Sequence, residues 1–177
     1  MEQKLRLNIG CGKDYCEGYL NCDWTDRIKV DKVVNLEEKL PFKDNSVDEV
    51  LAYHVLEHIK NFIQLIHELY RVCKKGSIIY VKTPFYSAWG QFNDPTHVRF
   101  FTPWTFNYFN QGTYSHEVSS NKVMFKIKAK INFGIGESSK LNKIFNPIIN
   151  LDQRAYCRFF AWIFPSAELE YVLEVIK

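Results

Sequence analysis

Short apolar runs, each ended by a polar or turn-forming residue, divide the first half of the chain. They cover residues 5–9, 19–22, 33–34, 47–53 and 77–81. Runs of this length with abrupt polar ends are typical of buried strands, because a strand crosses a core in few residues. The sequence therefore predicts five short strands in this order.

A helix is predicted between the fourth and fifth strands. Apolar residues recur there at three- and four-residue spacing, which places them on one helix face. They are Ile59, Phe62, Ile63, Ile66, Leu69 and Tyr70. Gly76 is expected just beyond the helix, where a left-handed backbone favours glycine. A strand, a helix and a second strand at this spacing predict a parallel crossover.

The connections on either side of the second predicted strand are short. Each has about ten residues, whereas a helical crossover needs at least ~10–12. These connections are therefore predicted to be loops or single turns. One face of the sheet near the N-terminus should then be thinly covered.

Strict alternation of apolar and polar residues replaces this pattern over residues 123–131, and a final strand is predicted over residues 168–176. Period two indicates a strand with one buried face. The first segment carries Lys126, Lys128 and Lys130, and the last carries Glu168, Glu170 and Glu174. We expect the lysines to share a solvent face with glutamates of the last strand, because opposite charges pair across antiparallel neighbours.

Together these elements predict an α/β fold. It is a compact Rossmann-like open sheet, mostly parallel, with an antiparallel last strand at an edge and reduced helices near the N-terminus. The 177 residues are expected to form a single domain over residues 1–177. A chain of this size buries about 70% of its unfolded surface.

Charge and cysteine usage narrow the function classes. The net charge of +3 is small and lysines lie beside acids, so no nucleic-acid partner is predicted. No apolar run approaches the ~18 residues of a membrane span, and the charged residues 1–6 do not resemble a signal peptide. The five cysteines form no CxxC pair, so neither a disulfide framework nor a metal site is predicted. These features predict a reduced, cytoplasmic protein without a membrane partner.

The ends of the first two strands carry the candidate binding residues. In an open parallel sheet, ligands bind outside the carboxyl ends of the strands. Gly10 and Gly12 follow the first strand and permit close approach of the backbone to a ligand. Asp23 ends the second strand and suits a ribose diol, because a carboxylate only accepts hydrogen bonds. The gap between the glycines and Asp23 is much shorter than the ~20 residues of dinucleotide folds, which argues against NAD.

Four blocks of residues give the chain a family resemblance. They are 5–23, 33–42, 45–50 and the segment His54-Val55-Leu56-Glu57-His58-Ile59. In combination they resemble class I S-adenosylmethionine (SAM)-dependent methyltransferases, most closely the small group with the type 11 methyltransferase domain. The resemblance covers about residues 5–110 and continues more loosely over 156–175. It implies SAM as the cofactor.

The resemblance also implies roles for individual residues. Gly10 and Gly12 would pass beneath the methionine part of SAM, and Asp23 would bind the ribose hydroxyls. Asn35 would accept from the adenine amino group, Leu36 would offer its backbone N–H, and His54 would face the methyl end. The full implied cofactor set is Asn8, Gly10, Cys11, Gly12, Asp23, Trp24, Asn35, Leu36 and His54.

The sequence departs from the family pattern at two places. Asn8 stands where the family has an acidic residue, so a charge partner for the methionine amino group is lost. The segment 12–15 lacks the third family glycine. Weak SAM binding would arise first at these positions.

The segment 93–103 is the candidate acceptor side, because it follows the fifth strand and should lie over the ligand end of the sheet. Similar small methyltransferases carry a comparable stretch. His97 is a candidate general base, and Arg99 a candidate clamp for an acidic or phosphorylated acceptor. Both residues are equally compatible with a loop-fixing role. The predicted catalytic set is His97, Arg99 and His54.

The predicted function is methyl transfer from SAM to a small molecule, with a sugar or glycan precursor as the suggested acceptor. The chain has neither an Asn/Asp-Pro-Pro-aromatic motif nor a Pro-Cys pair, so methylation of nucleic-acid bases is disfavoured. The alternative is a non-catalytic SAM-binding or scaffold domain that retains the fold.

Overall fold

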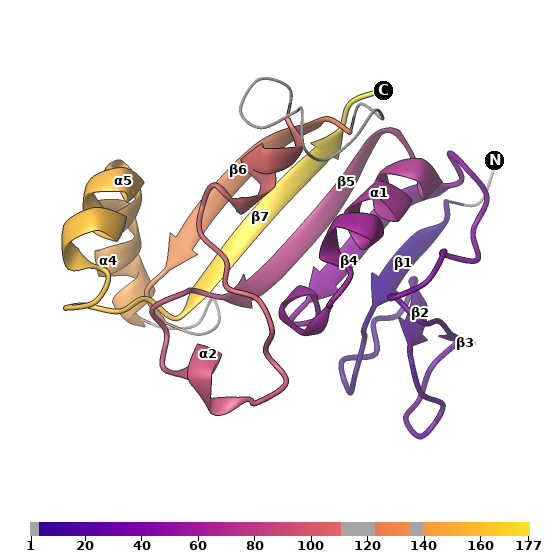
Figure 1. Cartoon of the computed structure of the whole chain (residues 1–177), viewed down its shortest axis with the longest axis horizontal. Helices are drawn as coiled ribbons and strands as arrows, with labels where there is room; N and C mark the ends of the chain where they lie inside the picture. Colours follow the sequence, from indigo (N-terminus) through magenta and orange to yellow (C-terminus); the bar gives the residue numbers. More distant parts are fainter. Residues whose placement is uncertain (1–3, 111–122, 135–139) are drawn as a thin grey trace.

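The computed structural model describes residues 4–110, 123–134 and 140–177. In these residues seven strands form one open sheet (Figure 1). The strands are β1 (Arg6–Ile9), β2 (Leu20–Asp23), β3 (Lys32–Val33), β4 (Val47–Tyr53), β5 (Cys73–Pro84), β6 (Phe125–Asn132) and β7 (Glu168–Val175). The strands predicted in the first half of the chain are all present, with shifts of a few residues at their ends.

The order across the sheet is β3-β2-β1-β4-β5-β7-β6. Strands β1 to β5 pair in parallel, and β7 pairs antiparallel with both β5 and β6. The predicted fold class is confirmed, but the reversed strand lies inside the sheet rather than at its edge. The reason is compositional: β7 alternates buried Leu169, Tyr171 and Leu173 with glutamates, whereas β6 carries the lysines that suit an exposed edge.

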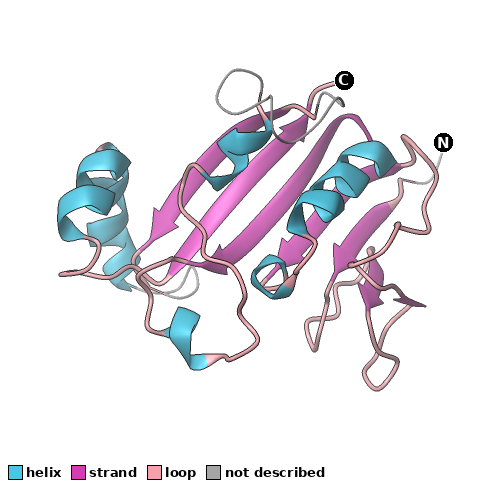
Figure 2. Cartoon of the chain, in the orientation of Figure 1, coloured by secondary structure: helices cyan, strands magenta, loops and turns pink. Residues whose placement is uncertain are grey.

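The helical segments in the described residues are few and short (Figure 2). They are η1 (Leu56–His58), α1 (Phe62–Val72), α2 (Gly90–Asn93), η2 (Thr105–Phe109), α4 (Lys140–Leu151), α5 (Gln153–Ala155) and the π-helical turn η3 (Tyr156–Phe160). The connections between β1 and β2 and between β2 and β3 contain no helix. The prediction of reduced helices near the N-terminus is therefore confirmed for this described part of the chain.

The crossover helix α1 buries one face against the sheet, through Phe62, Leu65, Ile66, Leu69 and Val72. Two details of the prediction for this helix are wrong. Ile63 is exposed rather than buried, and Gly76 does not cap the helix. The helix ends at Val72 because the fully buried Cys73 already has the extended backbone of β5. Gly76, with φ +79°, therefore lies inside that strand.

The predicted charge ladder between the last two strands is confirmed. In the antiparallel register Lys126 faces Glu174 and Lys130 faces Glu170, and each pair is 3.6 Å apart between Nζ and a carboxylate oxygen. Lys128 is exposed on the same strand face, opposite Val172. The lysines therefore face solvent and fix the register of the edge strand.

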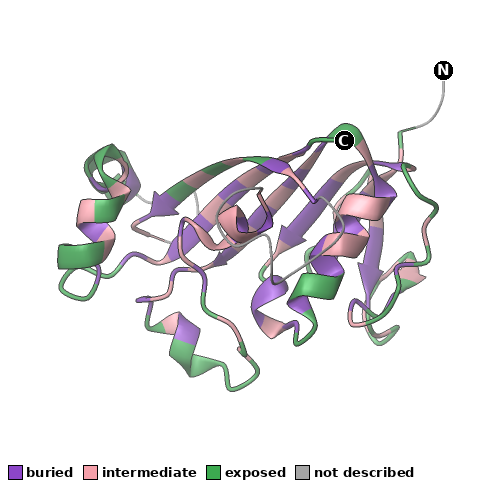
Figure 3. Cartoon of the chain, turned by 45° about the horizontal axis from the view of Figure 1, so that its top comes forward, coloured by how far each residue is buried: buried purple, intermediate pink, exposed green. Residues whose placement is uncertain are grey.

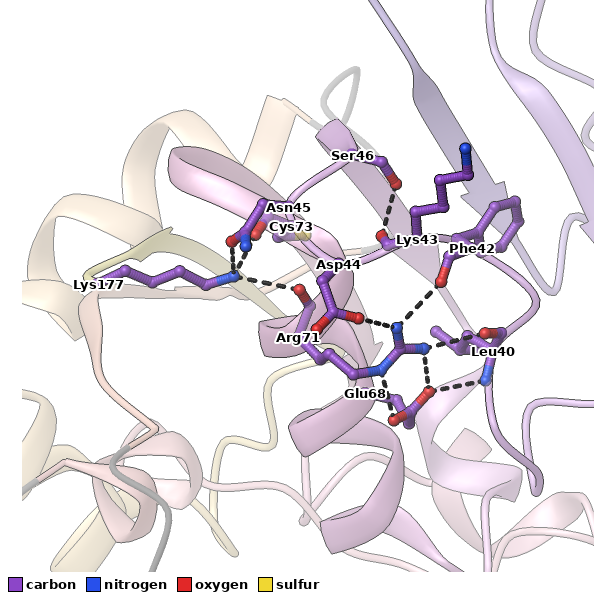
Figure 4. A network of polar contacts seen from close by, with 10 residues as sticks. All are labelled: Leu40, Phe42, Lys43, Asp44, Asn45, Ser46, Glu68, Arg71, Cys73 and Lys177. Atoms are coloured by element: carbon purple, nitrogen blue, oxygen red, sulfur yellow. Dashed lines mark hydrogen bonds and ion pairs between the residues drawn. The ribbon is translucent and has the colours of Figure 1, made fainter.

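A polar network anchors the loop between β3 and β4 to α1 (Figure 4). The Arg71 guanidinium donates to both carboxylate oxygens of Glu68, to Asp44, and to the backbone carbonyls of Leu40 and Phe42. Hydrogen bonds from Arg71 hold the pKa of both carboxyl groups below their ordinary values. Leu40, Phe42 and Asp44 therefore have a structural role in holding this loop.

Candidate functional site

The carboxyl ends of β1, β2, β4 and β5 lie along the same side of the sheet as the beginning of β7. We call this row of strand ends the carboxyl edge. Because β7 runs antiparallel to β5, its first residue, Glu168, lies beside Pro84, the last residue of β5. This edge gathers the predicted glycine turn, Asp23 and His54, as expected for ligand sites of open sheets.

The glycine turn packs directly on the segment after β4. Gly10 has φ +60°, and a Cβ added to it would lie 2.2 Å from Cγ2 of Val55, so no other residue fits without displacement. Gly12 has φ +52° with open space around it, and its N–H donates to Asp23 Oδ2 at 2.9 Å. The turn therefore joins the ends of β1 and β2 and leaves one side of Gly12 free for a ligand.

The structure gives Asn8 a structural role. Its buried amide donates both hydrogens within the protein, to the carbonyl of Asp14 and to Oδ1 of Asn21, each at 2.9 Å. Asn21 in turn accepts from the Cys16 N–H and donates to Asp31. The departure from the family pattern thus closes the loop between β1 and β2.

The remaining implied cofactor residues lie around the ends of β2 and β3. Trp24, which follows Asp23, is 77% exposed, and Leu36 is buried. Asn35 caps a turn, because its Oδ1 accepts from the Glu37 N–H at 3.0 Å and its Nδ2 donates to Glu38. The buried Cys11 is held by a backbone hydrogen bond to Cys22. These residues are close in space, and their contact with SAM stays a prediction.

His54 is held between two buried carboxylates. Its Nε2 lies 2.9 Å from Glu168 Oε1 and its Nδ1 lies 3.5 Å from Glu57 Oε1. These two carboxylates, Glu168 first, raise the His54 pKa from 6.5 to about 9. His54 also has φ +52°, a conformation that costs energy in a non-glycine residue and is frequent at functional sites. At neutral pH the ring is therefore a fixed imidazolium.

A cavity of about 350 Å³ opens beside this imidazolium. His54, Ser166 and Glu168 are its polar lining residues, and Trp89 and Phe133 contribute aromatic surface. Glu168 is 4% exposed, and its second oxygen, Oε2, has no hydrogen-bond partner among the residues that the structure describes. A buried carboxylate oxygen without a partner is costly, so this cavity is suited to a ligand that donates a hydrogen bond.

Glu57 and Glu168 are site residues to which sequence analysis assigned no site role. Glu57 was part of the HVLEH segment only as one of the residues that carry the family resemblance. Glu168 was predicted only as a strand residue with a solvent-facing partner. Its position as the first residue of β7, next to the buried Leu169, was the available signal.

The His54 pair predicts a pH dependence. Because the folded pKa is raised above the unfolded value of 6.5, the pairing contributes its full stability below pH 6.5 and loses it as the pH rises through about 9. We expect the His54 ring protons to titrate near pH 9 in NMR spectra, and the melting temperature to fall between pH 8 and 10 by more than in His54→Gln. A titration midpoint near 6.5 would show that the ring is not paired.

His97 and Arg99 do not line the cavity. His97 Nδ1 lies 3.0 Å from the carbonyl oxygen of Gln91. Arg99 donates to the carbonyl of Lys60 and stacks on the ring of Phe62, with Cζ 4.7 Å from the ring centroid. The segment that carries them is anchored to η1, because the Val98 N–H donates to the Glu57 carbonyl at 2.9 Å. Arg99 thus faces α1 and not His54.

Three side chains of types that can bind a metal ion lie close to one another. Glu57, His58 and His97 each offer an atom within 4.8 Å of the other two. The Nδ1 atoms of the two rings are engaged, with Thr96 Oγ1 at 2.8 Å from His58 and with the Gln91 carbonyl. The sequence predicts no metal site. The cluster has the donor set of a divalent-metal site and also the contacts that anchor the loop to η1.

Residues 7–81 match the family model described as a methyltransferase domain. An uncharacterized protein of Methanocaldococcus jannaschii is 36% identical over 90 residues, which cover 44% of this chain and 40% of that relative. The chain thus matches less than half of the length of this curated relative.

Solved structures share the fold across nearly the whole chain. A SAM-dependent methyltransferase from Archaeoglobus fulgidus superposes with a TM-score of 0.63 and 17% identity, covering 97% of this chain and 86% of that one. A phosphoethanolamine N-methyltransferase of Haemonchus contortus gives 0.60 and 14%, covering 99% and 49%. The [4+2]-cyclase SpnF gives 0.58 and 14%, covering 100% and 78%. The fold is therefore that of SAM-dependent methyltransferases. Because these sequence identities are low, the comparison shows the fold alone, and the chemistry has to be inferred from the site residues.

Proposed function

The chain carries a methyltransferase domain on the class I SAM-dependent methyltransferase fold, and we propose that it transfers the methyl group of SAM to a small-molecule acceptor beside His54. The observation that carries this proposal is the cavity at the carboxyl edge, where an oxygen of the buried Glu168 finds no partner in the described parts of the chain. The resemblance noted in the sequence is confirmed by the domain match over residues 7–81 and by the shared fold.

The residues at the ends of β1 and β2 fit SAM. Gly10 leaves no room for a side chain, and Gly12 leaves open space in which backbone can approach the cofactor. Asp23 uses Oδ2 to accept from the Gly12 N–H, and we assign its Oδ1 to the ribose hydroxyls. SAM supplies an activated methyl group on a sulfonium, so the protein's part is alignment and proton transfer.

The acceptor side follows from charge and hydrogen bonding. The carboxyl groups of Glu57 and Glu168 lie on the two sides of the His54 ring, and acidic side chains at this place suit a cationic cofactor nearby. An acceptor hydroxyl or amine would donate to Glu168 Oε2 and lose its proton there as the methyl group arrives. His54 then acts as a positioning residue that holds Glu168 in place.

The lining of the cavity supports a sugar or glycan precursor as the acceptor. Trp89 and Phe133 contribute aromatic surface, while Glu168 contributes a hydrogen-bond acceptor. An apolar wall beside a few polar groups is the usual composition of a small-molecule site. A volume of about 350 Å³ accommodates a monosaccharide-sized head group.

Binding of SAM is tested by Asp23→Ala. We expect the variant to lose about 1.5–3 kcal/mol of affinity, the value of a hydrogen bond to a charged group. That is a roughly 10- to 150-fold rise in Kd by calorimetry. Two control variants accompany this measurement. Asp23→Asn keeps an oxygen that accepts from the Gly12 N–H, and Asp26→Ala removes an exposed acid nearby. Unchanged affinity in Asp23→Ala would remove the ribose assignment.

Two variants test the predicted roles of His97 and Arg99. As a general base, His97 replaced by alanine would lower turnover by ~10²–10⁴ and leave SAM affinity nearly unchanged. As an acceptor clamp, Arg99 replaced by alanine would raise the acceptor KM.

Their hydrogen bonds to backbone carbonyls support the loop-fixing alternative. In that case each substitution removes about 1 kcal/mol and lowers the melting temperature by about 2–4 °C, with normal turnover per folded molecule. Stability, SAM affinity and turnover measured on both variants separate these outcomes.

The second candidate function is SAM binding without methyl transfer. The structural use of Asn8, where the family has an acid, favours it, and a [4+2]-cyclase shares the fold. Release of S-adenosylhomocysteine over a panel of sugars, amines and hydroxyl compounds distinguishes the two. Tight SAM binding without any product would favour the binding domain.

A further inference from the structure

Helix α4 turns its polar side chains toward the sheet. Asn142, Asn146 and Asn150, spaced by four residues, reach the free edge of β6 and the residues that follow it. Asn150 pairs with both the N–H and the carbonyl of Ile131, at 2.8 and 2.7 Å. Asn146 accepts from the Phe133 N–H at 2.9 Å, and Asn142 accepts from the Gly134 N–H at 2.7 Å. The asparagines thus complete the edge as another strand would.

This attachment leaves the apolar face of α4 pointing away from the protein. Its exposed members are Leu141, Ile144, Phe145, Ile148 and Leu151, the last of them 88% exposed. Helices on the surface of soluble proteins have the opposite arrangement, with the apolar face on the core. The asparagine hydrogen bonds fix the reversed orientation, so the apolar stripe cannot turn inward.

A second apolar segment lies at the same end of the molecule, next to α5 (Figure 1). Its exposed members are Phe159, Phe160, Trp162, Ile163 and Phe164. Figure 3 shows how largely exposed this end is compared with the sheet. We call these ten side chains the apolar end surface. Apolar patches of this extent on soluble proteins mark interaction sites.

Basic residues surround the apolar end surface. Residues 140–165 contain four basic side chains, Lys140, Lys143, Arg154 and Arg158, and one acidic side chain, Asp152. Their net charge of +3 equals that of the whole chain, so the remainder of the protein carries no net charge. All the excess positive charge therefore accompanies the apolar end surface.

We propose that the apolar end surface docks on a membrane that contains anionic lipids. Exposed aromatic and aliphatic side chains enter the boundary between head groups and acyl chains, and neighbouring lysines and arginines bind anionic head groups. A second copy of this chain is a poorer occupant, because a twofold contact would bring the same basic side chains together. In the described residues no helix is long and apolar enough to cross a membrane. The proposed contact is therefore peripheral, and it differs from the sequence-based prediction of no membrane partner.

The apolar end surface continues to the acceptor cavity. Phe145 of α4 stacks on Phe133, with ring centroids 4.5 Å apart, and Phe133 lines the cavity. Pro165, which directly follows the exposed segment, lines it too. A bilayer on this surface would lie beside the cavity rim. The docking itself does not depend on methyl transfer.

Vesicle co-sedimentation of the full chain tests the proposal. We expect binding to vesicles of phosphatidylcholine with 30% phosphatidylglycerol, and at least tenfold weaker binding to phosphatidylcholine alone. Arg154→Gln with Arg158→Gln should reduce binding to the anionic vesicles about 30-fold, since each charge near the surface contributes about fivefold. Ile144→Ser with Ile148→Ser should reduce it at least tenfold, and Ile63→Ser, an exposed position on α1, should not.

Every substituted side chain is exposed, so circular dichroism should show that all variants are folded. Equal binding of wild-type protein and the Ile144/Ile148 variant to anionic vesicles would overturn the proposal. So would the absence of vesicle binding together with a dimer, detected by analytical ultracentrifugation, that this variant disrupts. The second result would assign the surface to another copy of the chain.

Discussion

Glu168→Gln is expected to lower methyl transfer by about 10²–10⁴-fold, the contribution of a positioned general base. Glutamine has the same shape, and its amide oxygen can still accept from His54 Nε2. Glutamine lacks the negative charge of the carboxylate, which takes up the acceptor proton and pairs with His54. Because the ribose contact is assigned to Asp23, SAM affinity should change less than in Asp23→Ala.

The measurement is release of S-adenosylhomocysteine with an acceptor first identified on the wild-type protein. Glu170→Gln is the matched control, since Glu170 lies on the same strand but pairs with Lys82 and Lys130. We expect it to retain turnover. Normal turnover by a folded Glu168→Gln protein would exclude Glu168 as the base and would leave the cavity without its proposed chemistry.

Gly10→Ala is expected to destabilise the fold by about 2–5 kcal/mol. The new Cβ would lie 2.2 Å from Cγ2 and 2.7 Å from Cβ of Val55, and the backbone has φ +60°. Overpacking costs about 1–3 kcal/mol and the left-handed conformation about 1–2 kcal/mol. For a chain of this size the melting temperature should fall by about 5–15 °C.

Two further variants separate the steric cost from the backbone cost. Gly12→Ala has a similar φ of +52° but nothing within 4 Å of the added Cβ, so it should show only the backbone cost. Combining Gly10→Ala with Val55→Ala removes the clash, and the pair should be more stable than the sum of the single variants indicates. Equal melting temperatures for Gly10→Ala and Gly12→Ala would contradict the packing of the turn on Val55.

Features that depend on local periodicity could be predicted from the sequence. The strands, the crossover helix and the lysines of β6 each show a pattern that repeats within a few residues, because side-chain direction follows the period of the backbone. The glycine turn is also a local signal. The loops on either side of β2 could also be predicted, since these connections have too few residues for a helical crossover. The motifs carried the family resemblance, and with it the cofactor.

Only the tertiary structure decided which distant residues share a site. Reversal of β7 brings Glu168 against His54, 114 positions earlier in the chain, and no local pattern encodes that pairing. The fold likewise turns Arg99 onto Phe62, away from the cavity. Helix α4 was not among the elements predicted from the sequence, and periodicity does not determine which of its faces is inward. The free edge of β6 decided that, because its unpaired backbone groups bind asparagine side chains and leave the apolar face to the outside.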